Sequence, residues 1–236
     1  MTILKNFREI VLDTETTGLE HEGGDRIVEI GCVELINHIP TGNTYHVYIN
    51  PETQKMSPNA IKVSGITDEF LKDKPVFGKI ANDFLNFISD GVLVIHNAAF
   101  DISFLNSELK RLHKPLLKLE DTIDTLDLAH RKFPGASANL DALCRRFNID
   151  ASSREEHHGA LIDSLLLAEV YMELLGGKQS GLAFGSDENA TERIAIMQNT
   201  RQSRKKRTFK PSEAEIAAHD EFLKSMESPM WNKTAI

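Results

Sequence analysis

The run Val92-Leu93-Val94-Ile95 constrains the fold of this 236-residue chain more than any other segment. Every position of the run is apolar, and three of its four residues are β-branched, which favours a strand. A strand that is apolar throughout is typical of the interior of a sheet that helices cover on both faces. The run therefore predicts a layered α/β domain.

Further strand patterns precede this run, and helical patterns surround it. Residues 7–15, 26–36 and 44–50 have strand character, and the turn chemistry from Asn37 to Gly42 suggests that they form an antiparallel meander. Strands first, then alternating helices and strands, predict a mixed central sheet flanked by helices. The other expected elements are a helix at about 76–89, a helix from Asp101 to about Leu112, a strand near 122–124, and helices at about 125–132, 139–147 and 158–175.

The composition changes after Gly177. Residues 178–200 are rich in Gly, Ser, Asn and Gln, as in a flexible linker, and residues 201–210 contain six basic residues and no acid. Residues 212–226 regain a helical pattern with Ser212 as its N-cap. The expected organisation is a folded domain at 1–177, a linker at 178–210 and a tail at 211–236.

Charge and hydropathy narrow the class of protein. The net charge of −8 argues against a protein that grips nucleic acid through its own basic surface. The acidity lies in residues 1–175, with 17 Lys/Arg against 27 Asp/Glu, whereas residues 176–236 have 10 against 8. No apolar run approaches the roughly 18 residues of a membrane span, and residues 1–10 lack a signal-peptide pattern. We therefore expect a cytoplasmic protein without membrane contact, in which Cys32 and Cys144 are reduced core thiols.

Four carboxylates and one histidine in three segments are the candidate catalytic residues. Asp13 and Glu15 are two positions apart at the end of a strand, so their side chains leave the same face of the sheet. Asp101 follows the buried strand by a short turn, a usual place for ligand residues in α/β sheets. His158 precedes Asp163 by five positions at the start of the last helix of the domain. Such a set suits two divalent cations beside a general base, and it predicts a metal-dependent phosphodiesterase.

Each segment also has a plain structural interpretation. Asp13 and Glu15 could be exposed acids at a strand end, Asp101 could cap a helix, and a lone histidine is often a surface or core residue. No segment alone identifies a catalytic site. Their order and spacing together favour one.

The three segments resemble the motifs of the 3′→5′ exonucleases named for their Asp-Glu-Asp-Asp carboxylates, in the subgroup with a histidine base. The match consists of Asp13-x-Glu15, of Asp101 after His96-Asn97-Ala98-Ala99-Phe100, and of His158 with Asp163. The resemblance extends over residues 7–175 and implies a ribonuclease-H-like fold. Within this family the chain is most similar to the proofreading (epsilon) subunits of bacterial DNA polymerase III, in the segments Val94 to Ile102, Ser137 to Cys144 and Glu215 to His219.

The resemblance implies catalytic roles for all five residues and a need for two Mg²⁺ or Mn²⁺ ions. One ion is expected at Asp13, Glu15 and Asp163, and a second at Asp13 with help from Asp101 through water. His158 is expected to take the proton of the attacking water. Asp13, Glu15, His158 and Asp163 are also the expected contacts to the substrate, which is a single-stranded or frayed 3′ end of DNA. The expected product is a nucleoside 5′-monophosphate.

One segment departs from the family pattern. Residues 56–66 keep a Pro-x-Ala-x-x-Val-x-Gly-Ile frame, but Asn59 and Ser64 stand where a Glu and a His that contact the terminal nucleotide are expected. We therefore assign no substrate role to either residue.

The linker and the tail suggest partners. Gln179, Leu182 and Phe184 resemble the peptides that dock in the sliding-clamp (beta) groove, with the two apolar side chains filling pockets and the glutamine at the rim. The terminal helix and Trp231 resemble the family's tail that binds the polymerase III catalytic (alpha) subunit. The basic run 201–210 is either a solvated segment or a contact to DNA or an acidic subunit.

Two other functions stay open. One is an RNA-trimming exonuclease of the same family, which the clamp-like peptide disfavours. The other is a non-catalytic tether between polymerase and clamp, which the complete set of five active-site residues disfavours.

Overall fold

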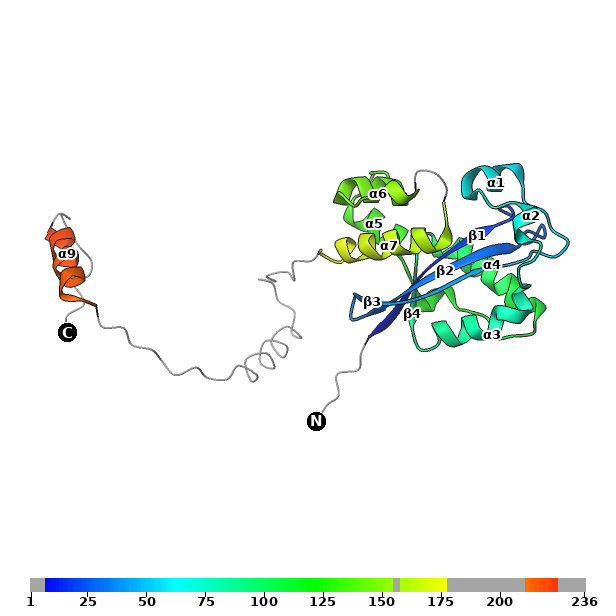
Figure 1. Cartoon of the computed structure of the whole chain (residues 1–236), viewed down its shortest axis with the longest axis horizontal. Coiled ribbons are helices and arrows are strands. Elements are labelled where there is room, and N and C mark those ends of the chain that lie inside the picture. The colour runs from blue at the N-terminus through cyan, green and yellow to red at the C-terminus, as the bar shows by residue number, and fades with distance from the viewer. Residues whose placement is uncertain (1–6, 155–157, 178–210, 225–236) are drawn as a thin grey trace, which may run out of the picture. The chain divides into compact units, whose positions relative to one another are not determined.

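A five-stranded mixed sheet forms the centre of the first of two units in this computed structural model (Figure 1). The structure describes residues 7–154, 158–177 and 211–224, and the second unit begins at Leu182. The strand order is β3-β2-β1-β4-β5, with β1 antiparallel to β2 and parallel to β4. The strands are β1 (Arg8–Thr16), β2 (Ile27–Ile36), β3 (Ile39–Tyr48), β4 (Val92–Ile95) and β5 (Thr122–Asp124). The expected mixed sheet is confirmed.

Helices cover both faces of this sheet, as the apolar strand predicts (Figure 1). Leu93 and Ile95 of β4 pack in the core formed with α3 and α4, whereas Val94 packs in the core formed with α5, α6 and α7. The helices of this unit are α1 (Pro58–Ser64), α2 (Asp68–Leu71), α3 (Phe77–Ile88), α4 (Ala98–Arg111), α5 (Thr125–Lys132), α6 (Leu140–Phe147) and α7 (Ala160–Leu174), with 3₁₀ turns at Leu119–Asp121 and Ser152–Arg154. Cys32 and Cys144 are buried free thiols, as expected.

The hairpin between β2 and β3 is tighter than the sequence predicts. Only Asn37 and His38 turn, with φ of 52° and 66°, and β3 already begins at Ile39. Two consecutive residues with positive φ match the twist of a two-residue hairpin. Pro40 is tolerated within β3 because β3 is an edge strand of the sheet. The predicted turn from Asn37 to Gly42 was therefore wrong in length.

Two short helices, α1 and α2, lie in a segment where apolar spacing predicts none. Ser57 caps α1 by accepting a hydrogen bond from the Ala60 N–H at 3.2 Å, and Gly65 ends the helix with φ of 70°. Capping residues rather than an apolar period define helices of this length. Helical spacing alone could not reveal them.

Asp101 lies inside the first turn of α4 and does not cap it. Asn97, with φ of 65°, stands at the N-cap position, and its side chain makes no capping bond. The Asp124 carboxylate at the end of β5 accepts hydrogen bonds from the N–H groups of Asn97 and Ala98, at 3.0 and 2.9 Å. Asp124 thus satisfies backbone donors at the helix start, which leaves Asp101 available to the site.

The second unit contributes one described helix, α9 (Glu213–Lys224). Ser212 and Glu215 form a reciprocal capping box, since the Ser212 N–H donates to Glu215 at 2.8 Å and the Glu215 N–H donates to Ser212 at 3.3 Å. The predicted N-cap is confirmed. The clamp-like peptide with Gln179, Leu182 and Phe184, the basic run 201–210, and Trp231 lie outside the described residues. Among the helices described, none has the length and apolar character needed to cross a bilayer.

Candidate active site

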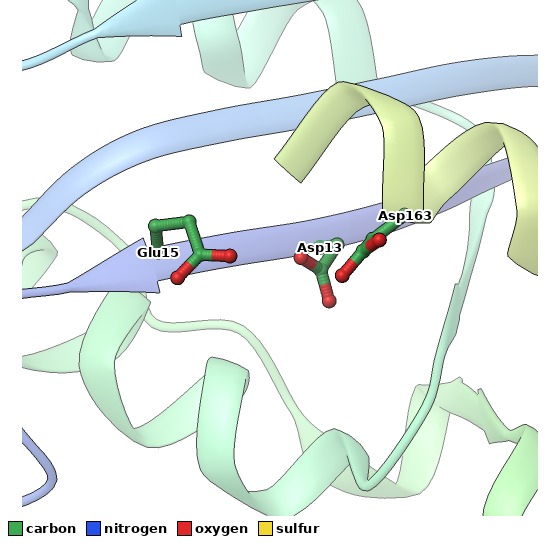
Figure 2. A group of neighbouring side chains, drawn as sticks. All are labelled: Asp13, Glu15 and Asp163. Atoms are coloured by element: carbon green, nitrogen blue, oxygen red, sulfur yellow. The ribbon is translucent and has the colours of Figure 1, made fainter. Parts of the chain in front are cut away.

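Three of the predicted site residues meet at the end of β1 (Figure 2). One carboxylate oxygen from each of Asp13, Glu15 and Asp163 lies within 4.8 Å of the others. Asp13 and Glu15 alternate along β1 with Ile10 and Leu12, which pack toward α3 and α4. The two acids therefore face α7, whose first turn carries Asp163.

A glycine on the neighbouring strand lets α7 approach this closely. Gly31 of β2 is the cross-strand partner of Asp13, and a Cβ at Gly31 would lie 2.3 Å from the backbone of Ala160 and Leu161. The Ser164 hydroxyl donates a hydrogen bond to the Gly31 carbonyl at 2.9 Å. The missing side chain thus places the start of α7 directly against the sheet and brings its carboxylate to β1.

Asp101 reaches the site from the opposite face of the sheet. Its side chain is buried, and the Thr14 hydroxyl donates a hydrogen bond to its Oδ1 at 2.7 Å. Asp101 lies close enough to Asp13 for its charge to raise the pKa of Asp13, but it is not one of the three clustered carboxylates. The structure therefore brings together three of the four predicted acids, with the fourth beside them.

The site gathers acidic side chains in buried or partly buried positions. Burial, followed by the charges of Asp101, Asp163 and Glu15, raises the pKa of Asp13 well above its usual value. Burial and then the charge of Glu29 raise the pKa of Glu15 to about 8. Burial also raises the pKa of Asp101 to about 7, although the Thr14 hydroxyl opposes that rise. Hard oxygen ligands that repel one another in this way fit a divalent cation, because a cation neutralises them together.

His158 lies in the loop before α7, next to its N-cap residue Gly159. Its backbone N–H donates to the Val63 carbonyl at 3.1 Å, which ties this loop to α1. Its Nδ1 lies 2.9 Å from Nη2 of Arg154 and 3.8 Å from Oδ2 of Asp163. Since a guanidinium can only donate, Nδ1 of His158 is the acceptor of that hydrogen bond. The predicted base and the predicted carboxylate are therefore neighbours.

Sequence reasoning missed four residues that shape this site. Arg154 and Thr14 carry no pattern that separates them from ordinary polar residues, and Gly31 is an unremarkable glycine within a strand. Glu29 offered a signal, because an acid inside the apolar run of β2 is unusual in a buried strand. It was not identified as part of the site.

Asn59 and Ser64 have different surroundings. The Ser64 hydroxyl donates to the Ala60 carbonyl at 2.9 Å and accepts from the Ile66 N–H at 3.2 Å, so it is used inside the end of α1. Asn59 is exposed and lines a cavity of about 530 Å³ next to Glu15. The apolar part of this cavity is formed by Leu19, Ala60, Val63 and Phe100.

The sheet, its covering helices and the clustered acids define an exonuclease domain of ribonuclease-H-like fold. The family model described as "RNase_T: Exonuclease" matches residues 10–171. The solved nuclease domain of 3′hExo, described as a DEDDh family member bound to rAMP, has the same fold, with a TM-score of 0.62 at 18% identity over 73% of this chain and 93% of that one.

Relatives that match nearly the whole chain identify the group of exonucleases to which it belongs. The DNA polymerase III subunit epsilon of Rickettsia felis is 51% identical over 94% of this chain and 98% of its own length. The subunit of the same name from Escherichia coli K12 is 44% identical over 90% of each chain. The chain belongs to the family of DNA polymerase III epsilon subunits.

Proposed function

We propose that this protein is the proofreading 3′→5′ exonuclease subunit of the replicative DNA polymerase. It would hydrolyse mismatched 3′-terminal nucleotides of DNA and release nucleoside 5′-monophosphates. The observation that carries the proposal is the meeting of Asp13, Glu15 and Asp163 beside His158, in a chain similar to epsilon subunits over 90% or more of its length.

The acids would hold the ions. Asp13, Glu15 and Asp163 would bind one divalent cation, Mg²⁺ or Mn²⁺, and Asp13 would bind a second with Asp101 acting through water. When bound, the two ions would acidify the attacking water and stabilise the charge on the leaving 3′ oxygen. The protein residues would supply the remaining chemistry.

His158 would act as the general base that removes the proton of the attacking water. A neutral imidazole accepts on only one of its two nitrogens. Because Nδ1 accepts from Arg154, the guanidinium would have to release Nδ1 before Nε2 could serve as the base. Oδ2 of Asp163, at 3.8 Å from Nδ1, would then be available to accept the Nδ1 hydrogen after a small movement.

The cavity next to Glu15 would hold the terminal nucleoside. Phe100, Leu19 and Val63 give it an apolar wall, and a base can stack on an aromatic ring regardless of its identity. Tolerance of base identity suits an enzyme that removes any mismatched nucleotide. Asn59 also lines this cavity, but it is an exposed and uncharged side chain and carries no substrate role in the proposal.

The catalytic (alpha) subunit of the polymerase would bind the tail 211–236, and the sliding clamp (beta) would bind the linker peptide with Gln179, Leu182 and Phe184. Support for these partners comes from the names of the relatives and from the peptide pattern. The domain 1–177 would carry the nuclease activity.

The test is digestion of a labelled primer with a mismatched 3′ end by the purified chain, with Mg²⁺ or Mn²⁺ and with EDTA. We expect metal-dependent release of nucleoside 5′-monophosphates by the wild type and none by Asp13→Ala. Full activity of Asp13→Ala would refute the catalytic assignment. Faster turnover of single-stranded RNA than of single-stranded DNA would instead favour an RNA-trimming role.

A further inference from the structure

Glu29 is a buried carboxylate next to the site that the proposed mechanism does not use. It lies on β2 as the direct cross-strand partner of Glu15, so the two side chains leave the same face of the sheet. Its side chain is only 2% exposed. Its Oε1 also lies 3.8 Å from the position that a Cβ would take on Gly159, the residue after His158. Glu29 thus lies beside both Glu15 and the segment that carries His158.

The two oxygens of Glu29 differ in their partners, and the charge of Glu29 also reaches Tyr48 on β3, whose pKa it helps burial to raise. Nε2 of His46 on β3 lies 2.7 Å from Oε1, whereas Oε2 is buried without a hydrogen-bond partner among the described residues. Among the described residues, Oε2 of Glu29 is the one buried side-chain nitrogen or oxygen atom without a hydrogen-bond partner. A buried carboxylate oxygen that lacks a partner costs free energy, and like charges directly opposite in a sheet add to that cost.

Other buried glutamates in the described domain are paired on both sides. Glu9 contacts the Tyr171 hydroxyl at 2.6 Å and the backbone N–H of His38 at 3.1 Å. Glu108 receives two hydrogen bonds from the guanidinium of Arg26, at 2.5 and 2.8 Å. Glu29, which lies beside Glu15, is therefore compensated less completely than these two glutamates.

We propose that Glu29, held by His46, is a positioning carboxylate of the cation site that increases its affinity for a divalent ion through charge and not as a direct ligand. The inference rests on the proposed function, because it requires an ion at Asp13, Glu15 and Asp163. A bound cation would offset the repulsion between Glu15 and Glu29, and it would supply the positive charge that the second oxygen of Glu29 lacks. Removal of outer carboxylates of this kind typically weakens metal binding about 10–100-fold.

His46 would fix Glu29 in this position. It is the cross-strand partner of Gly31, and its ring packs edge-on against Tyr48 with centroids 4.9 Å apart. Tyr48 is in turn the cross-strand partner of Glu29. The imidazole is therefore held by Tyr48 on its own strand while it contacts Glu29 on the neighbouring strand.

The test measures Mn²⁺ binding to the full chain by isothermal titration calorimetry without substrate, at a temperature where circular dichroism shows every variant to be folded. The wild type should bind Mn²⁺, and Asp13→Ala should not. Glu29→Gln should raise the dissociation constant about 10–100-fold. Glu9→Gln, which changes a buried carboxylate far along β1, should leave it unchanged, so that a general effect of losing a buried charge is controlled.

Two results separate the hypotheses. If the wild type binds no Mn²⁺, the proposed cation site itself fails. If the wild type binds Mn²⁺ and Glu29→Gln binds it equally well, the role of Glu29 is overturned while the site stands. Should Glu29→Gln not fold, His46→Gln decides: weaker Mn²⁺ binding supports the inference, and wild-type binding overturns it.

Discussion

Arg154 grips Asp163 with two parallel hydrogen bonds, from Nε to Oδ1 at 2.6 Å and from Nη2 to Oδ2 at 2.9 Å. The same guanidinium contacts Nδ1 of His158 and pairs with Asp141 on α6. Two parallel donors orient the carboxylate in addition to supplying a positive charge, whereas a lysine supplies only the charge. One arginine therefore fixes the orientation of a proposed ion ligand and at the same time occupies Nδ1 of the proposed base.

Replacing this arginine should lower the rate of nucleotide release. Without the guanidinium, Asp163 loses the two hydrogen bonds that orient its carboxylate, and we expect Arg154→Ala to reduce kcat about 10–100-fold, as for other residues that orient ligands. Arg154→Lys should have a kcat between those of the wild type and Arg154→Ala, because lysine keeps the positive charge but lacks the two parallel N–H donors of the guanidinium. Digestion of a mismatched primer measures both variants. Arg146→Ala, which removes an exposed arginine stacked on Phe133, is the matched control and should digest at the wild-type rate.

Stability in EDTA should fall as the pH rises. Burial and Glu29 raise the pKa of Glu15 from 4.5 to about 8, so the folded protein holds this proton more tightly than the unfolded chain does. That stabilisation is complete below pH 4.5 and disappears as the pH rises through about 8. Thermal unfolding measured between pH 4.5 and about 8 should show an unfolding temperature that decreases with pH. Mg²⁺ should restore stability at the alkaline end. The slope of this decrease should be smaller in Glu15→Gln; an unchanged slope would exclude Glu15 as its source.

A methyl group on Gly31 should displace α7. The new Cβ would meet the backbone of Ala160 and Leu161 at 2.3 Å, so Gly31→Ala must move the turn that carries Asp163. We expect a loss of about 1–3 kcal/mol in the free energy of unfolding, as in other overpacked cores, together with weaker Mn²⁺ binding. Denaturant titration and calorimetry measure the two effects. Gly78→Ala, whose Cβ would only touch Leu112 at 3.4 Å, should show neither.

Loss of the Thr14 hydroxyl should shift the pH dependence of activity. Thr14 donates to Asp101, and this hydrogen bond opposes the rise that burial causes in the pKa of Asp101. Thr14→Val should therefore raise that pKa above about 7 and move the acidic limb of the pH–rate profile to higher pH. Thr14→Ser keeps the donor and should retain the wild-type profile. Identical profiles for valine and serine would show that Asp101 does not titrate in the reaction.

Local sequence patterns predicted the parts of the fold that depend on periodicity. The apolar run of β4 gave a strand buried on both faces, and the two-residue spacing of Asp13 and Glu15 gave a shared face. Short segments escaped, because α1 and the Asn37-His38 turn depend on caps and on positive φ at single residues. Periodicity contains no information about such local conformations.

The site was predictable where it follows an ordered pattern and not where it depends on packing across the sheet. Glu29 and Gly31 contribute only because β2 lies beside β1 and under α7. Arg154 contributes because its guanidinium binds Asp163, and the nine-residue spacing between them does not predict this contact. Long-range neighbours of this kind appear only in three dimensions.

The close packing of α7 against Gly31 also determines at what stage of folding the cation site can form. Asp13 belongs to the first strand of the domain and Asp163 to its last helix, and their carboxylates meet only after that helix has docked on β2. A chain still emerging from the ribosome therefore contains β1 and its acids long before it contains a cation site. Nuclease activity should consequently be absent from nascent or truncated chains that end before α7.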